Sequence, residues 1–305
     1  TYNYNGATGG NSQASATAYA TFNGWAKTEN GAKVYNNQQS VSNLANTNNA
    51  TVTLYANWTD ASVTLPTPTR TGYTFGGWCS DSGLNTLVGA AGASNKPSTN
   101  VDLYAKWTVN TYAVTFDVQG GDAGSTSTTA TYDAAMPAIT VPERTGYTFG
   151  GYFTETNGGG TQYYNADGSS ARTWNIASAT NLYAKWTANQ YTVMLDGQNA
   201  TTAVTTKVTA TYDAAMPAIT VPERTGYTFG GYYTATDGGG TQYYYADGTS
   251  ANNWSIADAT MLYAKWTINK YTISFDTNGG TAINPITQDY KTAITAPDDP
   301  SREAY

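Results

Sequence analysis

Carboxylates are the side chains of this sequence best suited to catalysis, because it contains no histidine. Without histidine there is no Ser-His-Asp or Cys-His nucleophile, no histidine general base and no histidine-ligated zinc. A pair of Asp or Glu side chains is still sufficient for glycoside hydrolysis. The candidate carboxylates are Asp133, Asp167, Asp213 and Asp247.

These aspartates recur in two similar stretches, whereas a catalytic centre is usually unique within a chain. Roles in turns and helix caps explain them better, so we expect no enzyme. Cys79 is the only cysteine, which excludes an intrachain disulfide and predicts a small buried hydrophobe. The Gly-Gly-Gly loops at 158–160 and 238–240 lack the Lys of a phosphate-binding loop. We expect no cofactor and no metal site, and EF-hand spacing is absent.

Aromatic rings offer a second kind of chemistry, which is stacking on sugars. Two sets of rings occur at equivalent places, and they are Tyr163, Tyr164 and Trp174, and Tyr243, Tyr244 and Trp254. Exposed rings of this kind would be ligand-stacking residues. The alternative is that both tryptophans fill small cores while alternate tyrosines coat a strand.

Repeated motifs must position these residues, and a repeat decides the architecture of a chain. The stretch Arg144–Tyr152 is followed by the motif Leu-Tyr-Ala-Lys-Trp-Thr at 182–187, and related pairs of motifs recur elsewhere. In this motif Leu182, Ala184 and Trp186 alternate with polar or amphipathic residues, which predicts a half-buried strand. The glycines after Phe149 leave room for a bulge or for a neighbouring ring.

The repeats predict mostly β architecture in small α+β units, divided into five segments. These are a shortened unit at 1–59, a shortened unit without its leading strand at 60–108, full units at 109–187 and 188–267, and the first half of a unit at 268–305. The first two segments are either one fused, irregular unit or two trimmed ones. In the full unit, a strand near 128–132 follows the leading strand, and Ser169 or Ser170 is expected to cap a short helix through Ala177.

The repeated motifs resemble the Listeria–Bacteroides repeat, the family that includes the B-repeats of internalins. The resemblance rests on Tyr-Thr-Ile-Ser-Phe-Asp-Thr-Asn-Gly-Gly at 271–280, on the run from Pro66 to Trp78, and on four Tyr-Ala-Lys/Asn-Trp motifs. It covers nearly the whole chain. It implies tandem β-grasp-like domains with one short helix each, carried by bacterial surface proteins. Tyr152 and Tyr232 depart from the family pattern, which has Trp there.

Composition limits the partners of the protein. Only 11% of its 305 residues are charged, and the net charge is −7. This argues against nucleic acid and against an anionic membrane surface as partners. No apolar run approaches the length of a membrane helix, so no membrane insertion is expected within this chain. Because the sequence starts at Thr1 without a signal peptide, we expect a piece of something longer. The Thr-, Asn- and Tyr-rich composition is typical of extracellular adhesins and fibres.

The last segment resembles the beginning of a full unit and ends within the Arg-x-x-Tyr motif at 302–305. A boundary of the sequenced piece explains this. The alternative is complementation, in which this half-unit pairs with the incomplete N-terminal unit of another copy. The candidate assembly strand contains Tyr271, Ile273 and Phe275.

We therefore predict an elongated rod of β-grasp-like repeats, located extracellularly or on the cell surface. It would act as a structural stalk or adhesive segment, with other copies of itself, other surface proteins or glycans as partners. Two alternatives remain open. One is a self-assembling filament or sheath subunit joined head-to-tail by complementation, and the other is a carbohydrate-binding module.

Overall fold

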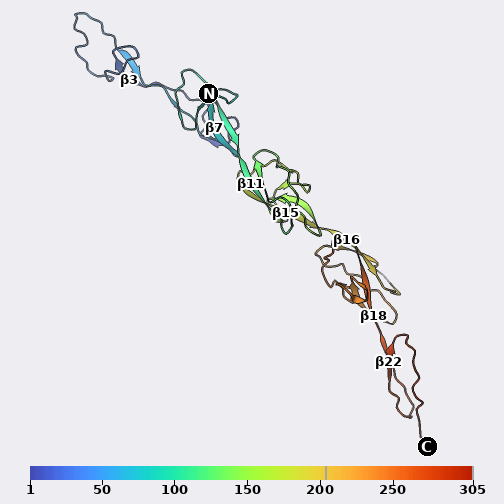
Figure 1. The fold of residues 1–305 in the computed structure, drawn as a ribbon. Coiled ribbons are helices and arrows are strands. Elements are labelled where there is room, and N and C mark those ends of the chain that lie inside the picture. Colours follow the sequence, from blue (N-terminus) through green and yellow to red (C-terminus); the bar gives the residue numbers. More distant parts are fainter. Residues whose placement is uncertain (203–204, 304–305) are drawn as a thin grey trace. The chain divides into compact units, whose positions relative to one another are not determined.

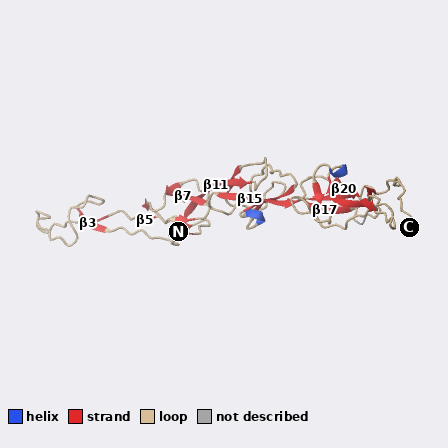
Figure 2. Cartoon of the chain, turned by 90° about the horizontal axis from the view of Figure 1, so that it is seen from below, coloured by secondary structure: helices blue, strands red, loops and turns tan. Residues whose placement is uncertain are grey.

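The structure is a computed structural model that describes residues 1–202 and 205–303, and these residues form mostly β-strands and loops (Figures 1 and 2). The helical pieces among them are the single 3-10 turns η1 (Thr156–Gly158) and η2 (Thr236–Gly238), blue in Figure 2. No helix in the described ranges is long and apolar enough to cross a membrane.

The expected helix after Ser169 or Ser170 is wrong, because residues 169–177 are bends and bridges in the structure. The backbone N–H of Met136 donates to Ser170 Oγ at 2.9 Å, and this hydroxyl donates to the carbonyl of Arg172 at 2.8 Å. The serine therefore joins two distant segments instead of capping a helix. Such side chain–backbone bonds compete with helix formation, and they were not visible in the sequence.

Contacts divide the chain into two compact units. The first unit comprises Thr1–Thr115, Thr126–Ala138 and Ser169–Leu182, and the second comprises the other described residues. The last two residues of the expected motif at 302–305 lie outside the described residues.

In the first unit, a four-stranded sheet has the order β1-β10-β7-β8. Its strands are β1 (Tyr2–Asn3), β10 (Leu103–Val109), β7 (Tyr73–Cys79) and β8 (Leu87–Gly89). Strand β1 pairs with β10 in parallel, and β7 pairs with β10 in antiparallel fashion. Trp78 is fully buried, and the ring centroids of Tyr2 and Tyr4 lie 5.1 and 5.3 Å from its ring centroid. Cys79 is buried and carries a free thiol.

Residues 60–108 were expected to lack a leading strand of their own. Strand β1, from the start of the chain, occupies that place, because Tyr2 lies in register with Leu103. In the sequence between β1 and β10, strands β3 (Phe22–Ala26) and β4 (Tyr55–Trp58) pair with each other as a separate two-stranded sheet. Strands from both of the first two expected segments therefore share one sheet, and their division into one fused unit or two trimmed units stays a prediction. The remaining strands of these segments form short pairs, namely β2 (Gly9–Gly10) with β6 (Pro68–Thr69), and β5 (Val63–Thr64) with β9 (Ser94–Asn95).

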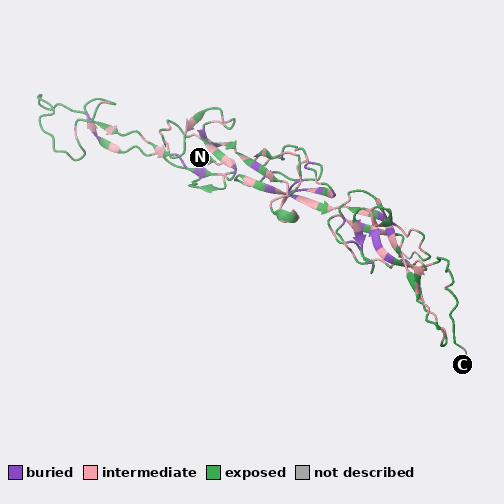
Figure 3. Cartoon of the chain, turned by 60° about the horizontal axis from the view of Figure 1, so that its bottom comes forward, coloured by how far each residue is buried: buried purple, intermediate pink, exposed green. Residues whose placement is uncertain are grey.

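The sheet of residues 190–268 has the order β17-β16-β20-β18-β19. Its strands are β16 (Gln190–Asp196), β17 (Lys207–Thr211), β18 (Tyr227–Tyr233), β19 (Gln242–Tyr244) and β20 (Thr260–Ile268). Strands β16 and β20 are parallel, and the other neighbours are antiparallel. Buried segments lie on these strands, in purple in Figure 3, as the alternating pattern requires.

The preceding repeat has the same strand order, β12-β11-β15-β13-β14. Its strands are β11 (Thr111–Asp117), β12 (Ser127–Thr131), β13 (Tyr147–Phe153), β14 (Gln162–Tyr164) and β15 (Thr180–Ala188). The last segment contributes the two-stranded pair β21 (Lys270–Ile273) and β22 (Ile286–Asp289).

A bulge explains why two aromatic rings three residues apart share one core. The register between β18 and β20 shifts between Phe229 and Tyr232, and both side chains are buried. Gly231 has φ +109°, and a Cβ there would overlap with the Tyr244 carbonyl oxygen. A bulge, one of the two roles expected of the Gly-Gly pair, is therefore present, and it redirects one ring into the core.

Candidate functional site at the junctions between repeats

Each full repeat meets the next segment at a small aromatic contact. The ring of Tyr212 lies directly over Gly146, where a Cβ would overlap with the ring atoms. Gly146 also has φ +79°, a conformation that glycine adopts without steric cost. The rings of Tyr147 and Tyr212 meet edge to face, with centroids 5.7 Å apart and planes at 74°.

The linker residue Asn189, between β15 and β16, connects both sides of this contact. Its N–H donates to the Gly146 carbonyl at 2.9 Å, and its own carbonyl accepts from the Tyr212 N–H at 3.0 Å. Its side-chain Oδ1 accepts a hydrogen bond from Thr148 Oγ1 at 2.6 Å. One asparagine thus satisfies backbone groups of two repeats.

Two charged side chains, Arg144 and Asp213, contact Tyr147. The guanidinium of Arg144 lies 3.9 Å from the ring centroid of Tyr147, and its Nη1 donates to the Gln119 carbonyl at 3.1 Å. The Tyr147 hydroxyl donates to Asp213 Oδ2 at 2.8 Å. This hydrogen bond to a carboxylate, helped by partial burial, raises the pKa of Tyr147, because only the neutral phenol can donate.

The same contact occurs at the other two repeat ends. In the first, Tyr132 covers Gly72, and the Tyr73 hydroxyl donates to Asp133 Oδ2 at 3.1 Å. The shared residues there are Arg70, Thr74 and Asn110. In the last, Tyr290 covers Gly226, and the shared residues are Arg224, Tyr227, Thr228 and Asn269. Lys291 stands there where Asp133 and Asp213 stand in the others.

Sequence reasoning missed these junctions, although two of its candidate catalytic residues belong to them. Asp133 and Asp213 were candidate catalytic carboxylates, and each instead accepts a hydrogen bond from a tyrosine of the preceding repeat. Asp247 accepts two bonds from Thr249, which lowers its pKa, and Asp167 stands at the equivalent turn. In the part of the chain that the structure describes, no group of three or more His, Cys, Asp or Glu forms a metal site.

The predicted ligand-stacking rings lie inside the cores. Tyr163, Tyr164, Trp174, Tyr243, Tyr244 and Trp254 are each at most 1% exposed. The hydroxyl of Tyr244 donates to the Pro217 carbonyl, and the Tyr243 ring lies 4.7 Å from Trp254. Since these rings present no face to solvent, the burial favours the alternative in which both tryptophans fill the core.

The predicted assembly residues occur in or beside β21. Tyr271 is 49% exposed and Ile273 and Phe275 are half-buried, whereas Val193 in the equivalent strand β16 is fully buried. Among the described strands, β21 pairs with β22 alone, while β16 lies between β17 and β20.

Comparisons with known proteins agree with the repeats seen in the structure. The Listeria-Bacteroides repeat domain matches residues 46–106, 112–185, 191–265 and 271–305. A protein of Evansella cellulosilytica, named as a Gly-rich membrane protein, is 30% identical over 259 residues, which is 77% of this chain and 27% of that protein. Internalin H of Listeria monocytogenes is 34% identical over 122 residues, which is 40% of this chain and 20% of that protein.

The chain therefore spans only about a quarter of the length of the first of these relatives. The family match covers most of the chain, and it includes the glycines and tyrosines of all three junctions, while the linker residues Asn110, Asn189 and Asn269 lie between the matched ranges. The protein belongs to the Listeria-Bacteroides repeat family, a repeat family of bacterial surface proteins.

Proposed function

We propose that this chain is a structural stalk or adhesive segment of a cell-surface protein, built as a rod of β-grasp-like repeats. The observation that carries the proposal is the recurrence of one junction at all three repeat ends. In a tandem array each repeat contacts only its neighbours, so the contact between neighbours sets how independently they move. A ring on a glycine, held by an asparagine linker, limits bending at each joint.

The experiment is small-angle X-ray scattering of the full chain and of a variant with Tyr132→Ala, Tyr212→Ala and Tyr290→Ala. We expect a long, narrow distribution of interatomic distances for the parent. The variant should show a broader and shorter distribution, with unchanged circular dichroism. The control carries Tyr19→Ala and Tyr245→Ala, because these exposed rings lie outside the junctions. A compact parent, or a junction variant identical to it, would contradict the proposal.

A second candidate function is assembly into a filament by strand complementation. The observation in its favour is that β21 pairs with β22 alone among the described strands, with Tyr271 exposed. Such an edge is able to accept a strand from another copy, and a contact of this kind does not close on itself.

Sedimentation velocity over a wide range of concentration tests the assembly. Growing polymers should form in the parent and disappear in Ile273→Lys, because a charged residue beside a sheet edge blocks strand addition. The control is Ile294→Lys, since Ile294 is exposed and lies outside the strands. Sedimentation that does not change with concentration would eliminate this candidate and leave the stalk untouched.

A further inference from the structure

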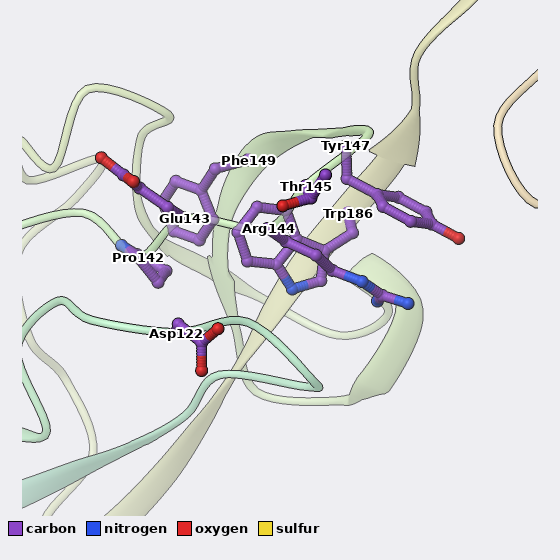
Figure 4. Close-up of a pocket in the computed structure, with 8 residues that line it drawn as sticks. All are labelled: Asp122, Pro142, Glu143, Arg144, Thr145, Tyr147, Phe149 and Trp186. Carbon is purple, nitrogen blue, oxygen red and sulfur yellow. The ribbon is translucent and has the colours of Figure 1, made fainter. Parts of the chain in front are cut away.

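A groove lies beside the strand that ends each full repeat, next to the junction tyrosine. In the first full repeat its volume is about 360 Å³, and Arg144 and Tyr147 of the junction line one side of it. Its lining includes Asp122, Pro142, Glu143, Phe149 and Trp186 (Figure 4). The volume is near the lower end for small-molecule sites, so the groove has room for a small ring and not for a globular partner.

The indole of Trp186 forms the apolar wall of this groove. It is half-buried, and its Nε1–H donates to the Val118 carbonyl at 2.8 Å, which fixes the plane of the ring. The Phe149 and Trp186 ring centroids lie 5.4 Å apart with planes at 60°. Phe149 is buried and the Arg144 guanidinium covers one face of Tyr147, so the indole is the main ring face of the groove. A Cβ on Gly121 would come within 2.6 Å of the indole, so glycine allows the adjoining turn to lie against it.

Two carboxylates lie at the rim. The backbones of Asp122 and Glu143 exchange hydrogen bonds of 2.7 and 2.9 Å, and this pairing holds both side chains beside the groove. Both residues are exposed. Figure 4 shows the two carboxylates on one side of the Trp186 ring and the Arg144 guanidinium on the other side, near Tyr147. The arginine is engaged there with the Gln119 carbonyl and the tyrosine ring.

The next repeat contains the same groove, with a volume of about 290 Å³. Trp266 donates its Nε1–H to the Gly197 carbonyl at 2.9 Å, and Phe229 meets it at 5.4 Å and 60°. Glu223 stands at the position of Glu143, and Thr201 joins the lining on the side where Asp122 lies in the first groove. A carboxylate beside a fixed indole is therefore common to both grooves.

We propose that these two grooves bind pyranose residues of a neutral glycan. The apolar face of a sugar ring would lie on the indole, and its hydroxyls would donate hydrogen bonds to the glutamate. An anionic ligand would face these carboxylates and a chain of net charge −7. A quaternary or lysine-like cation prefers several open aromatic faces, whereas in each groove the phenylalanine is buried and an arginine already lies over the tyrosine ring.

This proposal does not rest on the stalk, although each groove shares an arginine and a tyrosine with the adjacent junction. It also differs from stacking by Tyr163 or Tyr243, because those rings are buried.

The experiment is an NMR titration of the full chain with a panel of neutral hexasaccharides of glucose, mannose and N-acetylglucosamine. The indole Nε1–H signals of Trp186 and Trp266 are the readout. We expect both to shift with at least one sugar, and the affinity to fall about tenfold or more in Glu143→Ala with Glu223→Ala, because hydrogen bonds to charged groups are lost. The control is Glu155→Ala, an exposed glutamate outside the groove lining.

Folding is checked in the same spectra, and single Glu143→Gln and Glu223→Gln variants, which keep a hydrogen-bond acceptor, should retain binding within a few-fold. No indole shift with any member of the panel would overturn the proposal. So would shifts that the double alanine variant leaves unchanged, or indole shifts caused by polylysine and not by sugars.

Discussion

The junctions at Tyr147 and Tyr227 share nearly every contact and differ at one residue. The guanidinium lies 3.9 Å from the first ring and 3.8 Å from the second. In both, the linker asparagine donates its N–H to the glycine carbonyl at 2.9 Å and accepts from a threonine hydroxyl at 2.6 Å. At the first junction Asp213 accepts a hydrogen bond from the Tyr147 hydroxyl. At the second junction Lys291 occupies that position, and its Nζ lies 5.5 Å from the Tyr290 ring centroid.

Comparing Asp213 with Lys291 distinguishes the contacts common to both junctions from the hydrogen bond that only the first junction has. The ring over glycine and the asparagine bonds persist whether an acid or a base is present, so they form the shared part of the joint. The carboxylate adds one hydrogen bond at a partly exposed site, where such bonds contribute little because water competes for both partners. Predictions about each part therefore differ in size.

The largest effect is expected from adding a methyl group under the ring. Gly146→Ala and Gly226→Ala each place a Cβ into a tyrosine ring at a backbone φ near +80°. We expect each change to lower the local opening free energy of its junction by about 2–4 kcal/mol, from overpacking and backbone strain together. Hydrogen exchange at the Asn189 and Tyr212 amides, and at their equivalents Asn269 and Tyr290, measures this.

Gly92→Ala is the matched control for backbone strain. Gly92 has φ +70°, but a Cβ there would have nothing within 4 Å. We expect it to cost only about 1 kcal/mol, since strain acts without overpacking. If Gly146→Ala and Gly92→Ala had equal effects, the ring would not be pressed against the glycine, and the shared part of the joint would be misidentified.

A second comparison concerns tyrosine hydroxyls with and without partners. The Tyr232 hydroxyl is buried, with no hydrogen-bond partner among the described residues. Trp78, at the equivalent place in the first unit, donates its Nε1–H to the Pro66 carbonyl. We expect Tyr232→Phe to stabilise the protein by about 1 kcal/mol in urea unfolding, because an unsatisfied buried hydroxyl is removed.

The same residue makes stability depend on alkaline pH. Burial, assisted by the charge of Asp196, raises the pKa of Tyr232 from 10.0 to about 12. The unfolded phenol loses its proton first, so stability is complete below pH 10 and falls as pH rises towards 12. Tyr152 has the same shift in the preceding repeat. The Tyr232→Phe variant should therefore lose less stability over this interval than the parent.

Tyr244→Phe is the control, because the Tyr244 hydroxyl donates to the Pro217 carbonyl at 2.8 Å. Removing it should destabilise the protein by about 1 kcal/mol, since the carbonyl loses its partner. If both phenylalanine variants destabilised the protein, Tyr232 would have a partner that the structure does not hold.

A smaller effect is expected from removing the hydroxyl of Tyr147 or of Tyr227, because only Tyr147 has a carboxylate partner. Tyr147→Phe removes the hydrogen bond to Asp213, and we expect a loss of about 0.5 kcal/mol in local opening because the site is partly exposed. Tyr227→Phe should have almost no effect, because Lys291 stands where the acceptor would be. Hydrogen exchange at the Tyr212 amide measures the effect of Tyr147→Phe, and exchange at the Tyr290 amide measures the effect of Tyr227→Phe. Equal losses at both junctions would contradict the assignment of this bond to Asp213.

A feature of the fold could be predicted from the sequence when it depends on neighbouring residues, and not when it depends on contacts between distant segments. The strand at residues 182–187 was predicted, because alternation is a local signal, and a bulge was one of the two roles expected of the Gly-Gly pair at 150–151. The burial of Tyr163 and the pairing of β1 with β10 were not predicted, since they depend on segments distant in the sequence. The junctions were missed for the same reason, although an Asn before each leading strand and a Tyr after each second strand recur with the repeats.

An effect of similar size is expected from giving the last junction the acid of the others. Lys291→Asp should increase the local opening free energy at the Tyr290 amide by about 0.5 kcal/mol. Part of any gain will come from the backbone, because residue 291 has φ +62° and Asp tolerates this conformation better than Lys does. A double-mutant cycle with Tyr227→Phe separates the two, since only the hydrogen-bond part disappears when the hydroxyl is absent. A gain that persists unchanged in the Tyr227→Phe background would show that Asp133 and Asp213 were suited to the turn, and that their bonds to tyrosine contribute nothing to the joint.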